Sequence, residues 1–269
     1  MSLTNILVHL DSGPRCGMRV AFAARLAARH GAHLTGLFAE MAPARRIGAS
    51  TSRRSETHLR AATAVAASFV ATTEAAGVVS RFLDVDRDGE QEILAGAASV
   101  ARHFDLVVLG QSEKGVRVPT DLPEHLIMEA GRPVLVLPHA GTYEDIGRRP
   151  VFAWNGGRAA ARALADAMPL VVPGADAMVV HANRRGESRD EFATLMIDHL
   201  AAHGIAARVR TVVVDEIGLM DGLLNLAADH SADLLAMGAF DHPGFALLGN
   251  GSGTRYLLCH MTLPVLFSH

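Results

Sequence analysis

The sequence is poor in the residues that several common kinds of site require. Lys114 is the only lysine, so neither a phosphate-binding loop of the GxxxxGK[ST] type nor a Ser-x-x-Lys catalytic pair is present. Cysteine occurs twice, as Cys16 and Cys259, which are too distant in sequence for a Cys-x-x-Cys motif. These absences exclude lysine-dependent phosphate sites, cysteine metal knuckles and a framework of disulfides.

Neither sign of charge dominates, and no long apolar run is present. The chain has 25 basic and 28 acidic residues, with a net charge of -3, so it lacks the basic surplus typical of nucleic-acid binding. No stretch approaches the roughly 18 apolar residues that span a bilayer, and the first residues do not resemble a secretion signal. We therefore expect a soluble, cytoplasmic protein without nucleic-acid or membrane partners.

An internal repeat organises the 269 residues. Three segments recur in the same order: residues 6–13 (ILVHLDSG) as 150–157 (PVFAWNGG), 104–110 (FDLVVLG) as 232–238 (ADLLAMG), and 131–139 (GRPVLVLPH) as 262–269 (TLPVLFSH). Since a domain typically takes roughly 100–200 residues, the length allows two. We predict two related domains, 1–140 and 148–269, separated by a polar stretch that contains glycine.

Short apolar runs alternate with longer helical patterns in both halves. Strands are expected at 6–10, 33–38, 78–85, 106–109, 134–137, 151–154, 177–181, 207–214, 234–237 and 265–267. Helices are expected at 15–30, 56–77, 90–103, 159–170, 190–203, 218–230 and 254–260, with Gly31, Gly77 and Gly204 as helix-ending residues. The pattern predicts the α/β class, each domain having a doubly wound parallel sheet of about five strands.

A glycine-rich pattern follows one of these strands in the second half. Gly238-Ala-Phe-Asp241 is followed by nine residues and then by Gly251-Ser252-Gly253-Thr254. This resembles the universal stress protein family, whose ATP-binding members have G-x-x-G, nine residues and G-[S/T]. The resemblance covers nearly the whole chain. The layout of the repeat is similar to that of the tandem, two-domain bacterial members.

The resemblance implies a fold, an assembly and a function. The fold would be the adenine nucleotide alpha hydrolase-like one, and the last strands, 133–137 and 264–267, would pair to make the chain an intrachain pseudo-dimer. A homodimer would be a further level of assembly. The implied function is a stress response through ATP binding in the second domain.

The positions of the motif have a physical meaning of their own. Glycine at Gly238 lets the backbone approach a ligand closely, and the free N–H groups where a helix begins after Gly251, Ser252 and Gly253 suit phosphate. By the resemblance, the adenine and ribose would lie near the strand-end residues Ala153, Asn155 and Ala182. The alternative is that the glycines serve only the turn and that the serine only caps the helix.

Two residues depart from the family pattern. Asp241 stands where the second motif glycine is expected. It would repel phosphate, hold a Mg²⁺ ion that bridges to phosphate, or mark a site that has lost its ligand. Asn155 stands where nucleotide-binding members usually have aspartate, but it can still donate and accept hydrogen bonds.

The first half departs further from the pattern. No G-[S/T] pair follows Gly110, and the next helix is expected to be capped by Asp121 with Glu124 three residues later. Asp11 keeps the strand-end acid. We interpret this half as a non-binding or weak partner domain.

Other candidate sites have simpler interpretations. His199 and His203 are spaced for metal chelation on a helix, but no third ligand is apparent, and a solvated face explains them. The basic stretch 45–54 could reach over an anionic ligand or be merely solvated.

Three functions remain open from the sequence. The favoured one is binding of an adenine nucleotide or a related small anion, with at most slow, incidental ATP hydrolysis because no nucleophile or general base is positioned. The second is a stress-related interaction protein that binds no nucleotide and acts through its dimer surface. The third, an enzyme of the wider nucleotide-binding α/β group, is disfavoured because SGGxDS-like and HIGH-type motifs are absent.

Overall fold

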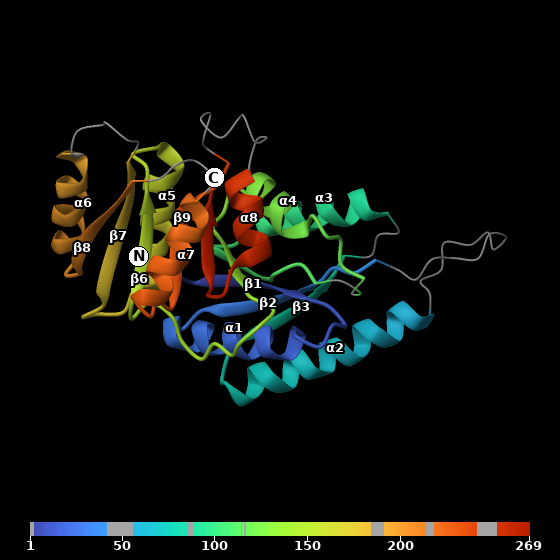
Figure 1. Ribbon diagram of the computed structural model, residues 1–269. Helices are drawn as coiled ribbons and strands as arrows, with labels where there is room; N and C mark the ends of the chain where they lie inside the picture. The colour runs from blue at the N-terminus through green and yellow to red at the C-terminus, as the bar shows by residue number, and fades with distance from the viewer. Residues whose placement is uncertain are drawn as a thin grey trace. The chain divides into compact units, whose positions relative to one another are not determined.

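The computed structural model describes residues 3–41, 56–85, 89–113, 115, 117–183, 191–213, 218–240 and 252–269. The chain forms two compact units that divide between Val134 and Leu135. Strands and helices alternate through each unit, as Figure 1 shows. Each unit is described separately below.

The first unit is built on parallel strands in the order β3-β2-β1-β4. Its elements are β1 (Asn5–Leu10), α1 (Cys16–His30), β2 (His33–Phe38), α2 (Glu56–Ala75), β3 (Ser80–Asp84), α3 (Glu90–Ala101), β4 (Leu106–Gly110) and α4 (Leu122–Glu129). The next strand of the chain, β5 (Val134–Leu137), begins at the division between the units.

The second unit repeats this arrangement with strands in the order β10-β9-β6-β7-β8, all parallel. Its elements are β6 (Pro150–Trp154), α5 (Arg158–Ala167), the 3-10 turn η1 (Met168–Leu170), β7 (Asp176–Asn183), α6 (Glu191–Ala202), β8 (Ala206–Val213), α7 (Leu219–Asp229), β9 (Leu234–Gly238), α8 (Ser252–His260) and β10 (Val265–Ser268).

The predicted fold class is confirmed: the described residues of each half form five strands, with helices between parallel strands. The helix-ending glycines Gly31, Gly77 and Gly204 adopt φ angles of 63°, 66° and 73°, the left-handed conformation that glycine takes without strain. None of the helices in the described ranges is long and apolar enough to span a membrane.

Several predicted boundaries need correction. The helix expected at 159–170 ends at Ala167 and continues as the 3-10 turn, because proline at position 169 has no N–H to continue the α-helical hydrogen bonds. Asp121 precedes α4 but makes no hydrogen bond from its side chain to cap the helix. Its φ and ψ of -88° and 4° are not the extended angles that a capping residue adopts.

The two faces of the first sheet differ along β2 and β3. Gly36 of β2 lies against Phe69 of α2, and Ser80 of β3 is hydrogen-bonded to Thr73 of α2 at 2.7 Å. Even-numbered residues of these strands therefore face α2, and odd-numbered residues such as Thr35 face the other side of the sheet. Figure 1 shows α1 and α2 on one side of β1–β3, with α3 and α4 on the other.

Gly36 provides a test of this packing. A Cβ atom added there would lie 2.5 Å from Cδ1 of Leu10 and 3.0 Å from the Phe69 ring, so Gly36→Ala should lower the free energy of unfolding by about 1–3 kcal/mol. Gly17→Ala in α1 is the control, because nothing lies within 4 Å of its added Cβ. Urea unfolding should show a loss of stability for Gly36→Ala only. Equal stabilities of the two variants would contradict the described packing.

Candidate functional site

The order of the strands predicts where a ligand crevice lies in the second unit. β6 pairs with β7 on one side and with β9 on the other, so the chain leaves the carboxyl ends of β6 and β9 in diverging directions. In sheets of this kind, ligands bind beyond the carboxyl ends of the strands at such a point. The residues to consider are therefore those that follow Trp154 and Gly238.

The turn after β6 leaves its polar side chain in solvent. The Oδ1 atom of Asn155 accepts a hydrogen bond from the N–H of Gly157 at 2.9 Å, and Gly156 between them has a φ of 72°. Asn155 is exposed, and α5 begins directly afterwards. The free N–H groups of the first turn of α5 thus lie at the same edge of the sheet as the Asn155 amide.

Gly238 has a packing requirement of its own. A Cβ atom at this position would lie 2.6 Å from the carbonyl carbon of Ala159 and 2.6 Å from the nitrogen of Ala160. Glycine is thus needed for the close approach of β9 to the start of α5. Any contact of Gly238 with a ligand would be additional to this role.

The chain that leaves β9 is connected to the start of α8. The N–H of Phe240 donates to Oγ1 of the buried Thr254 at 3.3 Å, and Phe240 has a φ of 57°, which is uncommon for a residue with a side chain. A Cβ atom at Gly253 would lie 3.1 Å from Cε of Met220. The first turn of α8 is therefore held near the end of β9.

The structure gathers several of the predicted site residues at this edge. Ala153 pairs with Met237 next to Gly238, while Ala182 lies near the end of the neighbouring strand β7, one residue after the partner of Trp154. Gly253 lies in the first turn of α8. Asp241 and Gly251 lie outside the described residues, as do the side chains of Ala182 and Ser252 and the basic stretch 45–54.

Trp154 is a residue at this edge that sequence analysis did not select. Its indole Nε1 is buried and has no hydrogen-bond partner among the described residues. It is the only tryptophan, and it precedes Asn155 at the end of β6. An isolated tryptophan at a strand end was the signal that could have identified it.

The first unit repeats the same turn after β1. The Oδ1 atom of Asp11 accepts a hydrogen bond from the N–H of Gly13 at 2.7 Å, just as Asn155 accepts one from Gly157. Here, however, the carboxylate is buried, and its Oδ2 atom lies 2.5 Å from Nη2 of Arg19. The acid that the sequence analysis noted is thus paired within its own unit.

Arg19 fills the space at the end of β4. Its Nε atom donates to the carbonyl oxygen of His9 at 2.7 Å, and its side chain is 4% exposed. A Cβ atom at Gly110 would lie 2.5 Å from Nη1 of Arg19, so the guanidinium lies directly against this glycine. When the two turns are aligned, the position of Arg19 corresponds to Ala163 of α5, which has no polar group.

A second ion pair, with a buried carboxylate and a partly exposed guanidinium, lies beside the first. Glu40, which is 1% exposed, accepts hydrogen bonds from the N–H and the hydroxyl of Ser12, both at 2.7 Å. It also accepts one from Nε of Arg117 at 2.5 Å. Both carboxylates at the end of β1 and β2 therefore have a guanidinium partner, and an anion entering this crevice would have to displace one of them.

Burial and charge shift two pKa values in this cluster. Burial, aided by the Arg19 guanidinium, lowers the pKa of His9 from 6.5 to about 4, against the opposing effect of Asp11. The Nε2 atom of His9 therefore carries the proton of a neutral ring and donates to the carbonyl oxygen of Ala39 at 2.9 Å. Burial alone would raise the pKa of Asp11, but Arg19 and His9 lower it below its usual value.

Metal binding has no support in the part of the chain that the structure describes. There, no group of three or more histidine, cysteine, aspartate or glutamate side chains could hold an ion. The rings of His199 and His203 lie close together, with their centroids 4.8 Å apart in an edge-to-face arrangement.

Comparison with solved structures identifies the fold. A universal stress protein from Archaeoglobus fulgidus DSM 4304 matches with a TM-score of 0.76 and 15% identity, over 98% of this chain and 95% of that one. A protein of unknown function from Pseudomonas aeruginosa PAO1 matches with a TM-score of 0.62 and 14% identity, over 99% and 92% of the two chains. No family model and no curated protein matches the sequence.

At these identities the likeness concerns the fold. The chain has the fold of universal stress proteins along nearly its whole length, as the resemblance of its glycine-rich segment led us to expect. The likeness of fold does not assign a ligand.

The histidine in the buried cluster predicts a loss of stability in acid. The unfolded chain takes up a proton at His9 below about pH 6.5, whereas the folded chain does so only near pH 4. The free energy of unfolding of the first unit should therefore fall by up to roughly 3 kcal/mol as the pH is lowered from 6.5 to 4. Asp11, whose pKa is lowered by folding, adds a further loss below its usual 3.8.

His9→Gln keeps a donor for Ala39 but does not titrate, so its thermal midpoint should vary less between pH 6.5 and 4 than that of the unaltered chain. His199→Gln changes an exposed histidine and should leave the pH profile as it was. Identical profiles for all three proteins would contradict the role of His9.

The buried guanidinium predicts a second effect. Arg19→Ala leaves the Asp11 carboxylate buried without its partner and should cost about 3–5 kcal/mol of folding free energy. Asp11→Asn in the same background should recover part of that loss, because the amide removes the uncompensated charge. Arg60→Ala, in an ion pair exposed on α2, should cost less than about 1 kcal/mol.

Proposed function

We propose that the second unit binds an adenine nucleotide such as ATP, or a related small anion, in the crevice between the ends of β6 and β9. The observation that carries this proposal is the contrast between the two crevices. In the first unit, Arg19 lies against Gly110 and pairs with Asp11. In the second, Ala163 stands at the position of Arg19, and Asn155 is exposed.

The phosphates would bind at the start of α8. The unpaired N–H groups of a helix start, with the positive end of its dipole, favour anions there, and Gly253 lies in this first turn. We assign phosphate contacts to Gly238, Gly251, Ser252 and Gly253, following the motif resemblance. Phe240 and Thr254, which are hydrogen-bonded to each other, would hold the two ends of the loop.

The base and sugar would lie over the ends of β6 and β7, near Ala153, Asn155 and Ala182. The side-chain amide of Asn155 has an N–H₂ group left to donate, because its oxygen accepts the Gly157 hydrogen bond. The buried indole N–H of Trp154, which lacks an acceptor among the described residues, is a further donor at this edge. Both features fit a ligand rich in hydrogen-bond acceptors.

Other parts of the proposal rest on the family resemblance. We assign the protein a role in stress responses in the cytoplasm, with domains at 1–140 and 148–269 that form an intrachain pseudo-dimer or a homodimer. The role is binding rather than turnover. Asp241 would either weaken phosphate binding or anchor a Mg²⁺ ion.

A stress-related interaction protein without a nucleotide is the second candidate. The observation in its favour is that two ion pairs, Asp11–Arg19 and Glu40–Arg117, engage both carboxylates at the corresponding edge of the first unit. A fold that has lost one site in this way could also have lost the other.

Fluorescence of Trp154 and calorimetry can test the nucleotide proposal directly. Because Trp154 is the only tryptophan and ends β6, ATP with Mg²⁺ should change its emission and bind with one site per chain. Gly251→Val should abolish binding by blocking the approach of the phosphate to the backbone. Gly17→Val in α1, where the added Cβ has free space, is the matched control and should bind normally.

Asp241→Gly distinguishes the two roles of the acid. Tighter ATP binding in this variant would mean that the carboxylate only repels phosphate, whereas loss of Mg²⁺-dependent binding would make it a metal anchor. If the wild-type chain binds none of ATP, ADP and AMP, the result would favour the second candidate function, the interaction protein. Binding that survives Gly251→Val would show that the phosphate assignment is wrong.

A further inference from the structure

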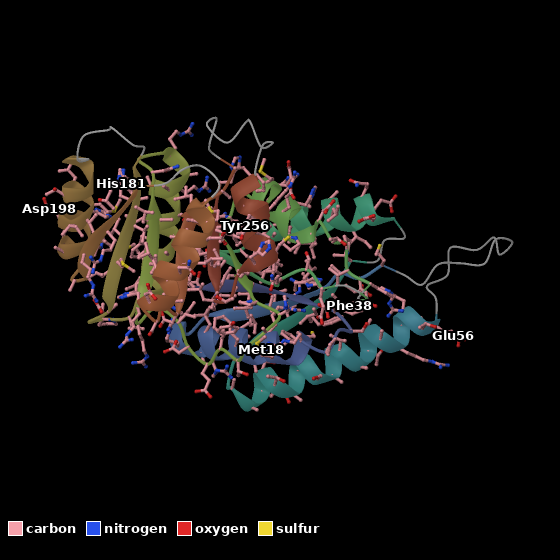
Figure 2. All side chains as sticks on the ribbon, viewed as in Figure 1. Met18, Phe38, Glu56, His181, Asp198 and Tyr256 are labelled. Atoms are coloured by element: carbon pink, nitrogen blue, oxygen red, sulfur yellow. The ribbon has the colours of Figure 1, made fainter. Side chains whose placement is uncertain are left out.

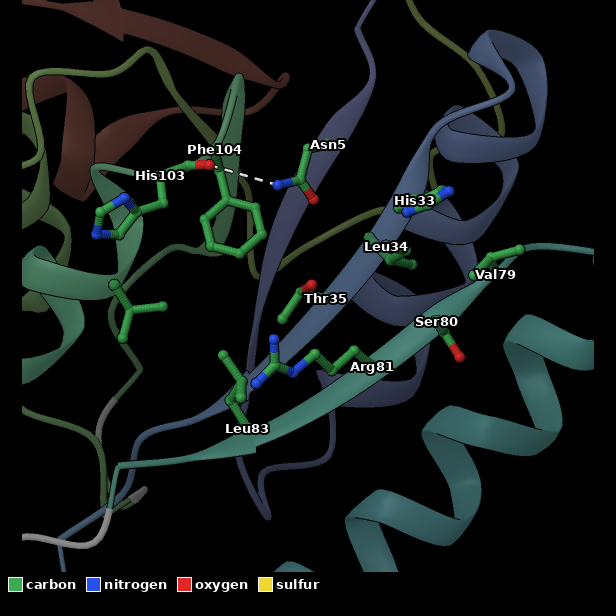
Figure 3. Close-up of a pocket in the computed structure, with 11 residues that line it drawn as sticks. Asn5, His33, Leu34, Thr35, Val79, Ser80, Arg81, Leu83, His103 and Phe104 are labelled. Atoms are coloured by element: carbon green, nitrogen blue, oxygen red, sulfur yellow. Dashed lines mark hydrogen bonds between the residues drawn. The ribbon is translucent and has the colours of Figure 1, made fainter.

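The first unit has a cavity at the opposite end of its strands from the crevice described above. It occupies about 470 Å³ and is lined by the starting residues of β1, β2 and β3 and by the last turn of α3 with the residues after it, as Figure 3 shows. This volume lies within the range of about 300–1,000 Å³ of small-molecule sites. None of the features discussed so far uses it.

Strand register determines which side chains face this cavity. Thr35 of β2 is the direct partner of Arg81 of β3, and Asn5 of β1 is the direct partner of His33. Partners in neighbouring strands point to the same face, and these residues lie on the face turned away from α2. Leu83, two residues after Arg81, shares that face.

Thr35 places a polar group without a partner on the floor of the cavity. The residue is 6% exposed, and its hydroxyl makes no hydrogen bond with any residue in the described ranges. Figure 3 shows its side chain pointing into the space between the strands and the end of α3. A hydroxyl that faces a cavity without a protein partner has the capacity to bind a ligand atom.

Arg81 places a positive charge beside that hydroxyl. It is exposed, and no described residue forms an ion pair or a hydrogen bond with its side chain, unlike Arg19 and Arg117. Asp105 follows a lining residue, Phe104, but does not line the cavity. Its Oδ2 atom already accepts three hydrogen bonds from Thr4 and Asn5, at 2.8, 2.8 and 3.0 Å.

The rest of the lining is mixed: five residues are apolar, and the polar ones are Asn5, His33, Ser80 and His103. Phe104 is buried, Val100 and Leu83 are partly exposed, and Val79 at the rim is 66% exposed, a large fraction for valine. These side chains offer a surface that an apolar ligand body would cover. The cavity thus places the Arg81 guanidinium and the unpartnered Thr35 hydroxyl beside an apolar part of its wall.

We propose that this cavity binds a small carboxylic acid with an apolar body, its carboxylate on Arg81 and the hydroxyl of Thr35. A guanidinium binds a carboxylate through two parallel hydrogen bonds, and a hydroxyl donates a third. The end of α3 at the cavity carries the negative pole of a helix dipole, which disfavours a multiply charged phosphate more strongly than a singly charged carboxylate. One carboxylate matches the one guanidinium.

Titration calorimetry with octanoate tests this site on the full-length protein. Octanoate should bind saturably with one site per chain, while 1-octanol, which lacks the charge, should bind at least tenfold more weakly. Inorganic phosphate, which lacks the apolar body, should not bind. Because Gly251→Val alters only the proposed nucleotide site, octanoate should bind that variant as it does the wild type, so the two proposals can fail separately.

Two variants locate the carboxylate. Arg81→Gln should weaken octanoate binding at least tenfold, and Thr35→Val, which keeps the shape of the side chain, should weaken it several-fold. Arg60→Gln, an exposed arginine on α2, is the matched control and should bind normally. Thermal melting checks that each variant is folded.

Several outcomes would overturn the proposal. They are absence of saturable binding, uptake of many octanoate molecules per chain, equal affinity for octanoate and octanol, and unchanged affinity in folded Arg81→Gln. Loss of binding in the Arg60→Gln control would also contradict it, because that residue does not line the cavity.

Discussion

Parallel pairing of strands is the constraint on which the rest of this structure depends. Two parallel strands cannot be joined by a tight turn, so each connection must cross a face of the sheet, and here the crossings are helices. The order of strands reverses direction between β1 and β4 in the first unit and between β6 and β9 in the second. At each reversal, sheets of this kind place a crevice beyond the carboxyl ends of the strands, and the turns after β1 and β6 lie there.

The same backbone turn has different surroundings in the two units. Asp11 and Asn155 both accept a hydrogen bond from the glycine two residues later, so the chain leaves β1 and β6 in the same way. In the first unit, Arg19 in the first turn of α1 pairs with Asp11. In the second unit, Ala163 stands at the position of Arg19, so Asn155 has no such partner. The two halves thus differ in the side chains that surround a similar backbone turn.

The sequence predicted the fold well because its signals are periodic and repeated. Apolar strand runs and the glycines that end helices, such as Gly31 and Gly204, depend on neighbours in sequence and were placed correctly. Arg19 escaped notice because its partners, Asp11 and Gly110, come together only through the order of strands. The cavity beside Thr35 and Arg81 depends on register across three strands, which no local pattern specifies. Of the predicted site residues, Ala153, Asn155, Ala182, Gly238 and Gly253 could be located at one edge, while their roles stay predictions.

The alternation along β3 also protects the folding of the first unit. A slip of β3 by one residue against β2 would turn Arg81 beneath α2 and expose Phe82 instead. Burial of an unpaired guanidinium costs several kcal/mol, so the misaligned sheet would be selected against during folding. Arg81, which gives the cavity its charge, therefore also disfavours a wrong register of β3. This strand lies at the edge of the sheet, where strands are most prone to mispair.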